Sequence, residues 1–547
     1  MHWIDSGDTR SEPSVPPHPH SQLPSRGSEP ERDQDGKTLL LDPVPINGSQ
    51  PLKTEHPTAD RSLAHSVFWN AIGDWGSQIL SWAGFLIVIR FVPPSDFGLA
   101  AMAVLLLPYM NLVTAFGIPR AVVTLRDLTG EQLAQLNSVS LAVSVACFGL
   151  AAALAKPLAL FFRSPRLAPV VVTVSTSLLL VGLQGVPAAI LAKQLRFRLL
   201  TLQNALSSVV STAITLLLAI AGMGYWALIL GNLLGAVIRC ALVLSSQPCR
   251  LAMPRLDTVR VPLRFGARIM VSMIASSSYS NLDNFVAGRT LGETALGLYG
   301  AAWGLANLPV EKITTLVTTV LPSYLATIQD QPTLLRRYLL TMTNTIALAT
   351  FPATVGLGLV ARDLVPVLLG PRWIGMAAPL AVLSYYAGFR SIVALLPRYL
   401  VAVGEVDFVM WNDLFALFLL PTAFYIGSSR GITGVAWGWV IAFPLVAIPL
   451  YRKTFRILRL RAIDYMAEIW PALEGTAAMI LFIWVSRRTL TAAWYGPHRL
   501  VFQVLAGGLT YFGVLGLRHR SRLRSLLELG RRAFKLDGVP QSDGVRP

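Results

Sequence analysis

The sequence predicts an all-α polytopic membrane protein with about 14 transmembrane helices, arranged as two parallel six-helix lobes plus two C-terminal helices. Hydrophobic residues make up 53% of the 547 residues and charged residues only 14%, a balance far from that of a soluble enzyme. Long apolar runs decide the class, because about 20 such residues cross the hydrocarbon core as a helix. The expected spans are Val67–Arg90, Phe97–Ile118, Leu133–Leu154, Ala168–Leu191, Leu199–Ala221, Tyr225–Ser245, Phe265–Gly288, Thr294–Val320, Leu334–Val360, Ile374–Pro397, Phe408–Ile426, Gly434–Leu450, Ala467–Val485 and Leu500–Leu517.

A repeated segment predicts the two lobes. The stretch Arg90–Leu99, which ends in Gly-Leu, returns as Arg289–Leu298, which ends in the same pair. Other matches follow at an offset that drifts from about 199 to about 206 residues, as in two diverged copies. Six spans, an even number, lie within the offset, so each helix of the second copy crosses in the same direction as its counterpart. We therefore expect parallel repeats around a central site, the arrangement of a two-lobed transporter. The further matches are Pro119 with Pro322, Thr124 with Thr327 and Asp127 with Asp330.

The N-terminal segment differs in composition from the rest of the chain. It is rich in Pro, Ser and charged residues, so it cannot bury enough apolar surface to fold, and it lacks the apolar core of a signal peptide. The expected organisation is a disordered cytoplasmic tail (1–62), transmembrane lobe 1 with helices 1–6 (63–250), transmembrane lobe 2 with helices 7–12 (251–460), helices 13 and 14 (461–518) and a basic cytoplasmic tail (519–547).

The net charge of +17 is distributed by side of the membrane. With the N-terminus placed inside, the inner loops and tails carry roughly 32 Lys and Arg residues and the outer loops about 10, as the positive-inside rule predicts. We expect both termini in the cytoplasm and a basic face toward anionic membrane lipids, without a nucleic-acid partner.

Acidic groups at membrane depth are candidate ion-coupling residues, because each costs about 3 kcal/mol to insert. Asp74 follows Asn70 by four residues in the first helix, so both lie on one face. Asp283 lies between Asn281 and Asn284 in the first helix of the second lobe. We expect Asp74 and Asp283 to bind the coupling ion, and Asn281 and Asn284 to line the cavity. The neighbouring serines are expected to bridge helices by hydrogen bonds.

Basic groups at membrane depth are candidate ligands for a phosphate, since charge-assisted hydrogen bonds gain strength in a low dielectric. Arg390 is the first candidate, and we expect Asn412-Asp413 to face the same cavity. Two arginines at helix ends, Arg90 and Arg289, are expected to snorkel to the interface and to anchor the two lobes at the same depth. The other cavity candidates are Lys312, Arg268 and Arg239.

Aromatic residues recur along the predicted spans. Sugar rings stack on aromatic faces, but interfacial belts use the same residues, and we interpret them as a belt. They are Trp69, Trp75, Trp82, Tyr299, Trp303, Tyr385, Tyr386, Trp437 and Trp439.

The sequence contains no recognisable enzyme site. A phosphate-binding P-loop is missing, so an ion gradient, a membrane potential or the substrate gradient must drive any transport. Three cysteines form neither a disulfide framework nor a metal-binding spacing. We expect no enzymatic activity, no cofactor and no metal.

The stretch Asn281–Ala302, with its Gly292 and Gly297-Leu298, resembles the central signature of Wzx-type polysaccharide flippases. These form the polysaccharide transporter branch of the multidrug/oligosaccharidyl-lipid/polysaccharide (MOP) exporter superfamily. Phe97-Gly98-Leu99 and Leu195–Leu199 fit the same pattern, the similarity covers about 64–460, and it is greatest to the colanic-acid-exporter-like subgroup.

The resemblance implies a V-shaped, two-lobed bundle in the bacterial cytoplasmic (inner) membrane. Such proteins flip undecaprenyl-diphosphate-linked oligosaccharide, a repeat unit of exopolysaccharide or lipopolysaccharide, by alternating access. The partners implied are the lipid-linked oligosaccharide and the polymerase and glycosyltransferases of its pathway.

Two alternatives stay open. A cation-coupled small-molecule exporter of the multidrug (MATE) type shares the fold and would require a compact apolar pocket instead of a cationic cavity. A membrane glycosyltransferase or polymerase would require an acidic catalytic residue in a large outer loop, whereas the first outer loop contains only Asp96.

Overall fold

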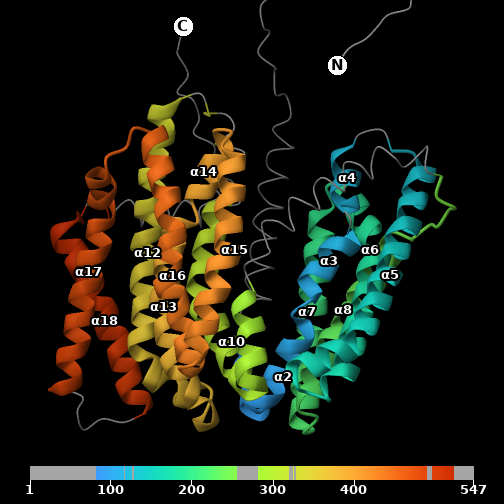
Figure 1. Ribbon diagram of the computed structural model, residues 1–547, viewed down its shortest axis with the longest axis horizontal. Coiled ribbons are helices and arrows are strands. Elements are labelled where there is room, and N and C mark those ends of the chain that lie inside the picture. Colours follow the sequence, from blue (N-terminus) through green and yellow to red (C-terminus); the bar gives the residue numbers. More distant parts are fainter. Residues whose placement is uncertain are drawn as a thin grey trace, which may run out of the picture. The chain divides into compact units, whose positions relative to one another are not determined.

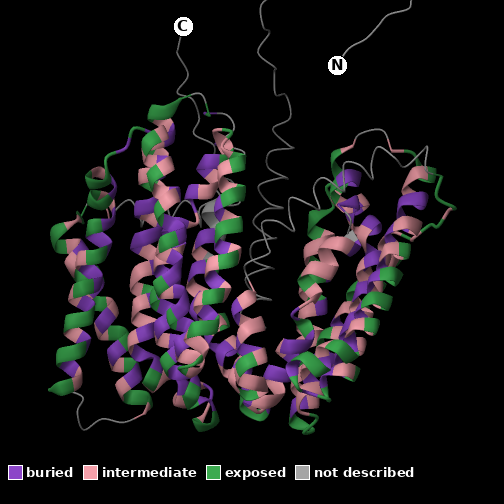
Figure 2. Ribbon diagram, in the orientation of Figure 1, coloured by how far each residue is buried: buried purple, intermediate pink, exposed green. Residues whose placement is uncertain are grey.

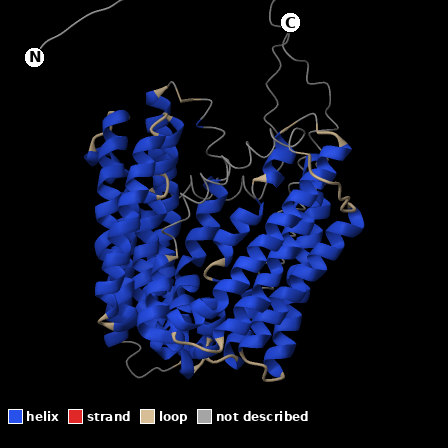
Figure 3. Cartoon of the chain, turned by 45° about the vertical axis from the view of Figure 1, so that its right-hand side comes forward, coloured by secondary structure: helices blue, strands red, loops and turns tan. Residues whose placement is uncertain are grey.

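The computed structural model describes residues 82–115, 117–125, 128–255, 281–318, 331–489 and 496–520, with a few single positions besides. Within these ranges every regular element is helical (Figure 3). The first lobe contains α2 (Pro94–Val104), α3 (Leu107–Ala115), α4 (Ile118–Thr124), α5 (Gly130–Phe162), α6 (Leu167–Lys193), α7 (Phe197–Ile220) and α8 (Tyr225–Ser246). The second contains α10 (Leu282–Thr318), α12 (Pro332–Leu368), η1 (Pro371–Met376), α13 (Ala377–Val393), α14 (Leu396–Ala402), α15 (Val406–Ser428) and α16 (Gly431–Ile457). Two further helices follow, α17 (Ala462–Arg488) and α18 (Pro497–Arg518).

The predicted helical membrane class is confirmed, but the count of 14 spans is not. Among the described residues, 11 helices are long and apolar enough to cross a membrane. The predicted span Val67–Arg90 is described only from Trp82, and the span Phe265–Gly288 only from Asn281. The end of the latter lies in α10 together with the next predicted span, and a kink at Gly292 (φ 84°, ψ −174°) divides α10 into two helical stretches between them. The number 14 therefore remains a prediction.

Local sequence explains how one long helix of the first lobe begins and continues. At the start of α5, the Thr129 hydroxyl accepts from the backbone N–H of Gln132 (3.2 Å). The side-chain oxygen of Gln132 accepts from the backbone N–H of Thr129 (2.9 Å). This capping box satisfies two donors that have no partner inside the helix. Pro157 lies further along α5 without ending it, as membrane helices allow when neighbouring helices satisfy the freed backbone groups.

The helices of the two lobes recur in the same order (Figure 1). In the first lobe α5 packs on α6 and α7 on α8, and in the second α12 packs on α13 and α15 on α16. The matched helices have similar lengths: α5 and α12 contain 33 and 37 residues, and α7 and α15 contain 24 and 23. The appended α17 and α18 pack on each other and on α12.

The two copies of the repeated Gly-Leu motif touch each other. A Cβ at Gly98 in α2 would lie 1.8 Å from the carbonyl oxygen of Glu293 in α10. A Cβ at Gly297 in α10 would lie 1.9 Å from the carbonyl oxygen of Pro94 in α2. Only glycine fits at both positions, because the two helices approach backbone to backbone. The repeated motif thus forms a symmetric contact between the lobes.

Arg90 reinforces this contact from the first lobe. Its Nε donates to the Leu368 carbonyl (2.9 Å) and its Nη2 to the Val367 carbonyl (2.7 Å), at the C-terminus of α12. A cation is favourable there, since the last carbonyls of a helix carry partial negative charge. The counterpart Arg289 lies over the Phe161 ring (5.2 Å), near the C-terminus of α5. Each arginine therefore contacts the other lobe. The predicted snorkelling to the membrane interface did not include these contacts between the lobes.

Large apolar side chains lie both on the surface and in the interior. Buried and exposed residues alternate along the same helices (Figure 2). Leu481, Leu509 and Phe418 are 62%, 75% and 74% exposed. Exposed apolar side chains of this size are typical of surfaces that face lipid tails, because lipid is as apolar as leucine. The interior of the second lobe packs around fully buried rings, among them Trp373 and Trp439.

Candidate functional site

A polar and aromatic cavity lies within the second lobe. It has a volume of about 530 Å³ and is bounded by α10, α13, α14, α15 and α16. Its polar lining comes from Arg390, Arg398, Asn412 and Asp413. Arg390 and Asn412-Asp413 are among the residues that the sequence analysis placed in a cavity, and the structure brings these three together. The aromatic lining is Trp303, Tyr386, Trp439 and Phe443.

Arg390 is held in one orientation by the helix opposite. Its Nη1 donates to Oδ1 of Asn307 (3.0 Å), and the amide of Asn307 donates in turn to the Trp303 carbonyl one turn earlier (3.0 Å). Asn307 is only 2% exposed, so its oxygen has a fixed position. The guanidinium also lies over the Trp303 ring (5.8 Å). An arginine has five N–H donors, and Asn307 is the only side-chain partner of Arg390 among the described residues. The remaining donors are available to a bound anion.

Stacked rings form the wall beside Arg390. Trp439 stacks on Tyr386 (4.9 Å between ring centroids) and lies 5.2 Å from Trp303. Trp439, Tyr386 and Tyr299 are 2%, 3% and 0% exposed, so the belt interpretation is wrong for these three. Packing inside the lobe, not contact with the membrane interface, explains their position. The neighbours Trp437 and Tyr385 are 48% and 42% exposed and remain on the surface.

Asp283 lies behind this wall and is completely buried. Its Oδ2 accepts from the Tyr299 hydroxyl (2.8 Å) and from Trp439 Nε1 (3.1 Å), and its Oδ1 accepts from the Asn284 backbone N–H (2.8 Å). The carboxyl group is thus satisfied by neutral donors, as buried polar groups require. Trp439, which donates to Asp283, also lines the cavity that contains Arg390.

Comparison with known sequences identifies the family. The sequence profile of the polysaccharide biosynthesis proteins matches residues 87–378, more than half of the chain. The chain belongs to this family. It is 24% identical over 74% of its length to the lipopolysaccharide biosynthesis protein WzxC of Escherichia coli (strain K12), covering 83% of that protein. It is 25% identical over 87% of its length to the succinoglycan biosynthesis transport protein ExoT of Rhizobium meliloti (strain 1021), covering 97% of it.

The fold is also known from solved structures. A structure of the lipid II flippase MurJ in an inward closed conformation matches with a TM-score of 0.66. The match covers 83% of this chain and 99% of that chain, at 15% sequence identity. The polysaccharide biosynthesis family member described here therefore shares the two-lobed transporter fold that the repeat predicts.

Of the other predicted site residues, those whose side chains the structure describes do not line the cavity of this family member. Asn281 and Asn284 lie beside Asp283 at the start of α10 and do not line the cavity. Arg239 lies on an exposed face of α8, in the other lobe. Lys312 belongs to α10, but its side chain is outside the described part of the structure. Asp74 and Arg268 lie outside the described residues altogether.

Sequence reasoning missed two polar residues, one that lines the cavity and one that only contacts Arg390. Asn307 orients Arg390, and Arg398 lies on the cavity wall beyond it. The spacing of Trp303 and Asn307, four residues apart, was a usable signal, since it places both on one helix face. Arg398 follows Arg390 by eight residues, a spacing that also favours a shared helix face. Among the described residues, no group of His, Cys, Asp or Glu could hold a metal ion.

Proposed function

We propose that this chain flips a polyprenyl-diphosphate-linked oligosaccharide across the bacterial cytoplasmic membrane by alternating access. Three of the compared proteins support this. WzxC is named for lipopolysaccharide biosynthesis, ExoT for succinoglycan transport and MurJ for flipping lipid II. The name of ExoT joins transport to the biosynthesis of a polysaccharide, and the name of MurJ states the flipping of a lipid.

The observation that carries the proposal is the geometry around Arg390. Its guanidinium is fixed by Asn307 and presents its free donors to a cavity that also contains Arg398. Guanidinium groups bind phosphate oxygens strongly when water is scarce. The rings of Trp303 and Tyr386 beside it provide apolar faces for a sugar. A cation and aromatic faces together fit a cargo that carries both a phosphate and a glycan.

The two alternatives fit this cavity less well. A small-molecule exporter for cations would gain from a negative or neutral cavity, but two guanidinium groups face one carboxylate, that of Asp413. A glycosyltransferase or polymerase would need a catalytic acid in a large outer loop, and Asp96, the acid that the sequence analysis placed in the first outer loop, lies within helix α2. Both alternatives therefore rank below the flippase.

The coupling mechanism is the finer part of the proposal. We propose that Asp74 and Asp283 take part in ion coupling, and that Arg268, Lys312 and Arg239 add positive charge along the cargo's path. Both termini lie in the cytoplasm in this scheme, because the basic residues concentrate on that side. The polymerase and glycosyltransferases of the same pathway are the proposed partners.

The test is a flipping assay with the purified chain in proteoliposomes that contain a polyprenyl-diphosphate-linked oligosaccharide. The accessible fraction of glycan is measured with an external glycosidase. We expect Arg390→Ala to lower the flipping rate at least tenfold, since a charge-assisted hydrogen bond to phosphate contributes about 1.5–3 kcal/mol. Arg390→Lys should retain part of the rate, because the charge remains but the planar fork is lost.

The matched control is Arg430→Ala, at an exposed position before α16, which should flip like the wild type. Flipping by Arg390→Ala at the wild-type rate, from a folded protein, would contradict the assignment of the cavity. The absence of flipping by the wild type, with export of small cations instead, would replace the flippase by the multidrug alternative.

A further inference from the structure

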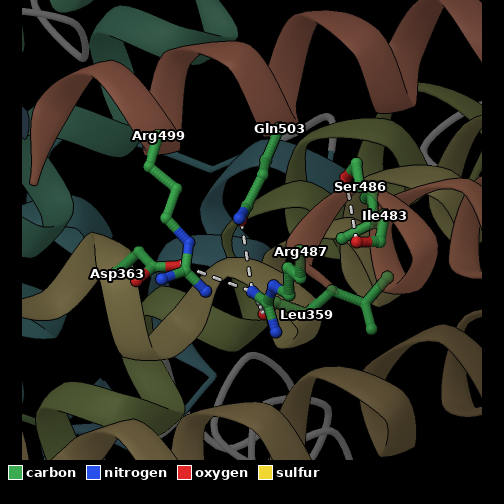
Figure 4. Close-up of polar contacts among 7 residues, drawn as sticks. All are labelled: Leu359, Asp363, Ile483, Ser486, Arg487, Arg499 and Gln503. Carbon is green, nitrogen blue, oxygen red and sulfur yellow. Dashed lines mark hydrogen bonds and ion pairs between the residues drawn. The ribbon is translucent and has the colours of Figure 1, made fainter. Parts of the chain in front are cut away.

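A second group of buried polar side chains lies where α12, α17 and α18 meet (Figure 4). It shares no residue with the cavity that contains Arg390. Asp363 on α12 forms ion pairs with two arginines. Its Oδ2 lies 3.4 Å from Nη2 of Arg487 and 3.6 Å from Nε of Arg499. Arg487 also donates to the side-chain oxygen of Gln503 (3.2 Å) and to the carbonyl of Leu359.

The charges in this group do not balance. Two guanidinium groups face one carboxylate, and the side chains of Arg487, Arg499 and Asp363 are only 26%, 22% and 19% exposed. A net positive charge that is largely removed from water is unfavourable unless an anion compensates it.

Several donors of the group also have no acceptor. Nε of Arg487, Nε of Arg499 and Nε2 of Gln503 are buried without a hydrogen-bond partner among the described residues. Gln503 as a whole is 1% exposed, so water does not reach its amide freely. Buried N–H groups are nearly always paired in folded proteins. Nε of Arg499 makes only the 3.6 Å ion pair with Asp363, and the other two donors have no partner among the described residues, which indicates a place for an anion with several oxygen acceptors.

An apolar pocket adjoins the group directly. It has a volume of about 480 Å³. Gln503 of the polar group lines it, and so does Ile483, which lies beside the group (Figure 4). The remaining lining is nearly all apolar and includes Leu305, Leu308, Leu364 and Phe512. A polar positive end beside an apolar pocket is complementary in charge and polarity to an amphiphile with an anionic head.

We propose that this site binds a phosphate-bearing membrane lipid. Phosphodiester oxygens would accept from Arg487, Arg499 and the Gln503 amide, and one acyl chain would lie in the adjoining pocket. The site goes beyond the proposed flipping of a glycan carrier and does not depend on it, because it shares no residue with the Arg390 cavity. It is a lipid-binding site formed by α12 of the second lobe and by the appended helices α17 and α18.

The test uses the full chain in detergent and measures lipid binding by native mass spectrometry. The probes are dioleoyl phosphatidylglycerol, dioleoylglycerol (which lacks the phosphate) and glycerol phosphate (which lacks the chains). We expect dioleoyl phosphatidylglycerol to bind the wild type at least tenfold more tightly than either other probe. Arg499→Gln and Arg487→Gln should each weaken this binding about tenfold, and Arg430→Gln, on an exposed position, should not change it.

A second variant protects the test against misfolding of the arginine variants. Gln503→Leu keeps the packing of the pocket and removes one unpaired donor, and it should weaken lipid binding about threefold. Equal binding of dioleoylglycerol, equal binding of glycerol phosphate, or unchanged binding by Gln503→Leu and both arginine variants would each overturn the proposal. Displacement of the phosphatidylglycerol by a polyprenyl-diphosphate-linked oligosaccharide at equal concentration would also overturn it, because the cargo would then be the occupant.

Discussion

Nε1 of Trp439 donates a hydrogen bond to Oδ2 of Asp283 over 3.1 Å, and this bond joins a fully buried carboxyl group to the wall of the cavity. Tyr299 donates to the same oxygen, and its hydroxyl lies 3.2 Å from the indole nitrogen. Any change in the charge of Asp283 must therefore move the ring that stacks against Tyr386, beside Arg390. The geometry connects a candidate coupling residue to a candidate cargo residue by direct contacts.

Trp439→Phe removes one donor from Asp283 and keeps the ring. We expect a loss of about 1–3 kcal/mol of stability, because a buried acceptor that loses its partner is not resolvated. Thermal unfolding in detergent measures this. The control is Trp437→Phe, two residues earlier and 48% exposed, which should unfold like the wild type. Equal unfolding temperatures for both variants would show that the bond to Asp283 contributes nothing.

Asp283→Asn tests the coupling role without removing the side chain's volume. The amide oxygen can still accept from Tyr299 and Trp439, so we expect the protein to remain folded while ion-driven flipping falls at least tenfold. The measurement compares flipping with and without an imposed ion gradient. A variant that responds to the gradient as the wild type does would remove Asp283 from the coupling mechanism.

Asn307→Leu removes the acceptor that orients Arg390 and keeps a similar volume. Because the guanidinium is then free to rotate over Trp303, we expect weaker cargo binding and flipping reduced about threefold to tenfold. The apparent affinity for the lipid-linked glycan should change more than the maximal rate. Asn232→Leu, an exposed asparagine on α8, is the control and should flip normally.

Gly98→Ala and Gly297→Ala test the contact between the lobes. Either Cβ would lie within 2 Å of a carbonyl oxygen of the other helix, so the lobes must separate locally at a cost of about 1–3 kcal/mol. We expect a lower unfolding temperature and an altered balance between the two access states. Gly300→Ala is the matched control on α10, since nothing lies within 4 Å of its Cβ position. Similar behaviour of all three variants would contradict the close approach.

Labelling of Cys249 tests the orientation of the chain in the membrane. It follows the end of α8, it is a free thiol, and burial raises the pKa of that thiol above its ordinary value. Since the thiolate is the reactive form, alkylation should be slow at neutral pH and should keep accelerating into the alkaline range. An impermeant maleimide should label inverted vesicles and not intact cells, with Cys249→Ser as the unlabelled control. Labelling of intact cells would reverse the proposed topology.

Several features of the fold could be predicted because they depend on local sequence. Apolar runs such as Leu199–Ala221 and Tyr225–Ser245 correspond to α7 and α8 within a few residues. Hydropathy acts on each span separately, so no knowledge of its neighbours is needed. Arg390 was identifiable for the same reason, since a guanidinium in an apolar run is costly wherever the helix packs.

The sequence by itself determined the membrane class, the duplicated order of the helices and the presence of costly polar groups in the spans. Only the tertiary structure decided which of these groups meet. Arg390 and Asn307 are 83 residues apart, and Asp283 and Trp439 are 156 apart, so no local pattern could pair them. The same holds for Gly98 and Gly297, each of which looks like an ordinary turn residue in its own copy of the repeat. Their contact, and the burial that turned expected belt residues into a cavity wall, follow from the packing of helices distant in sequence.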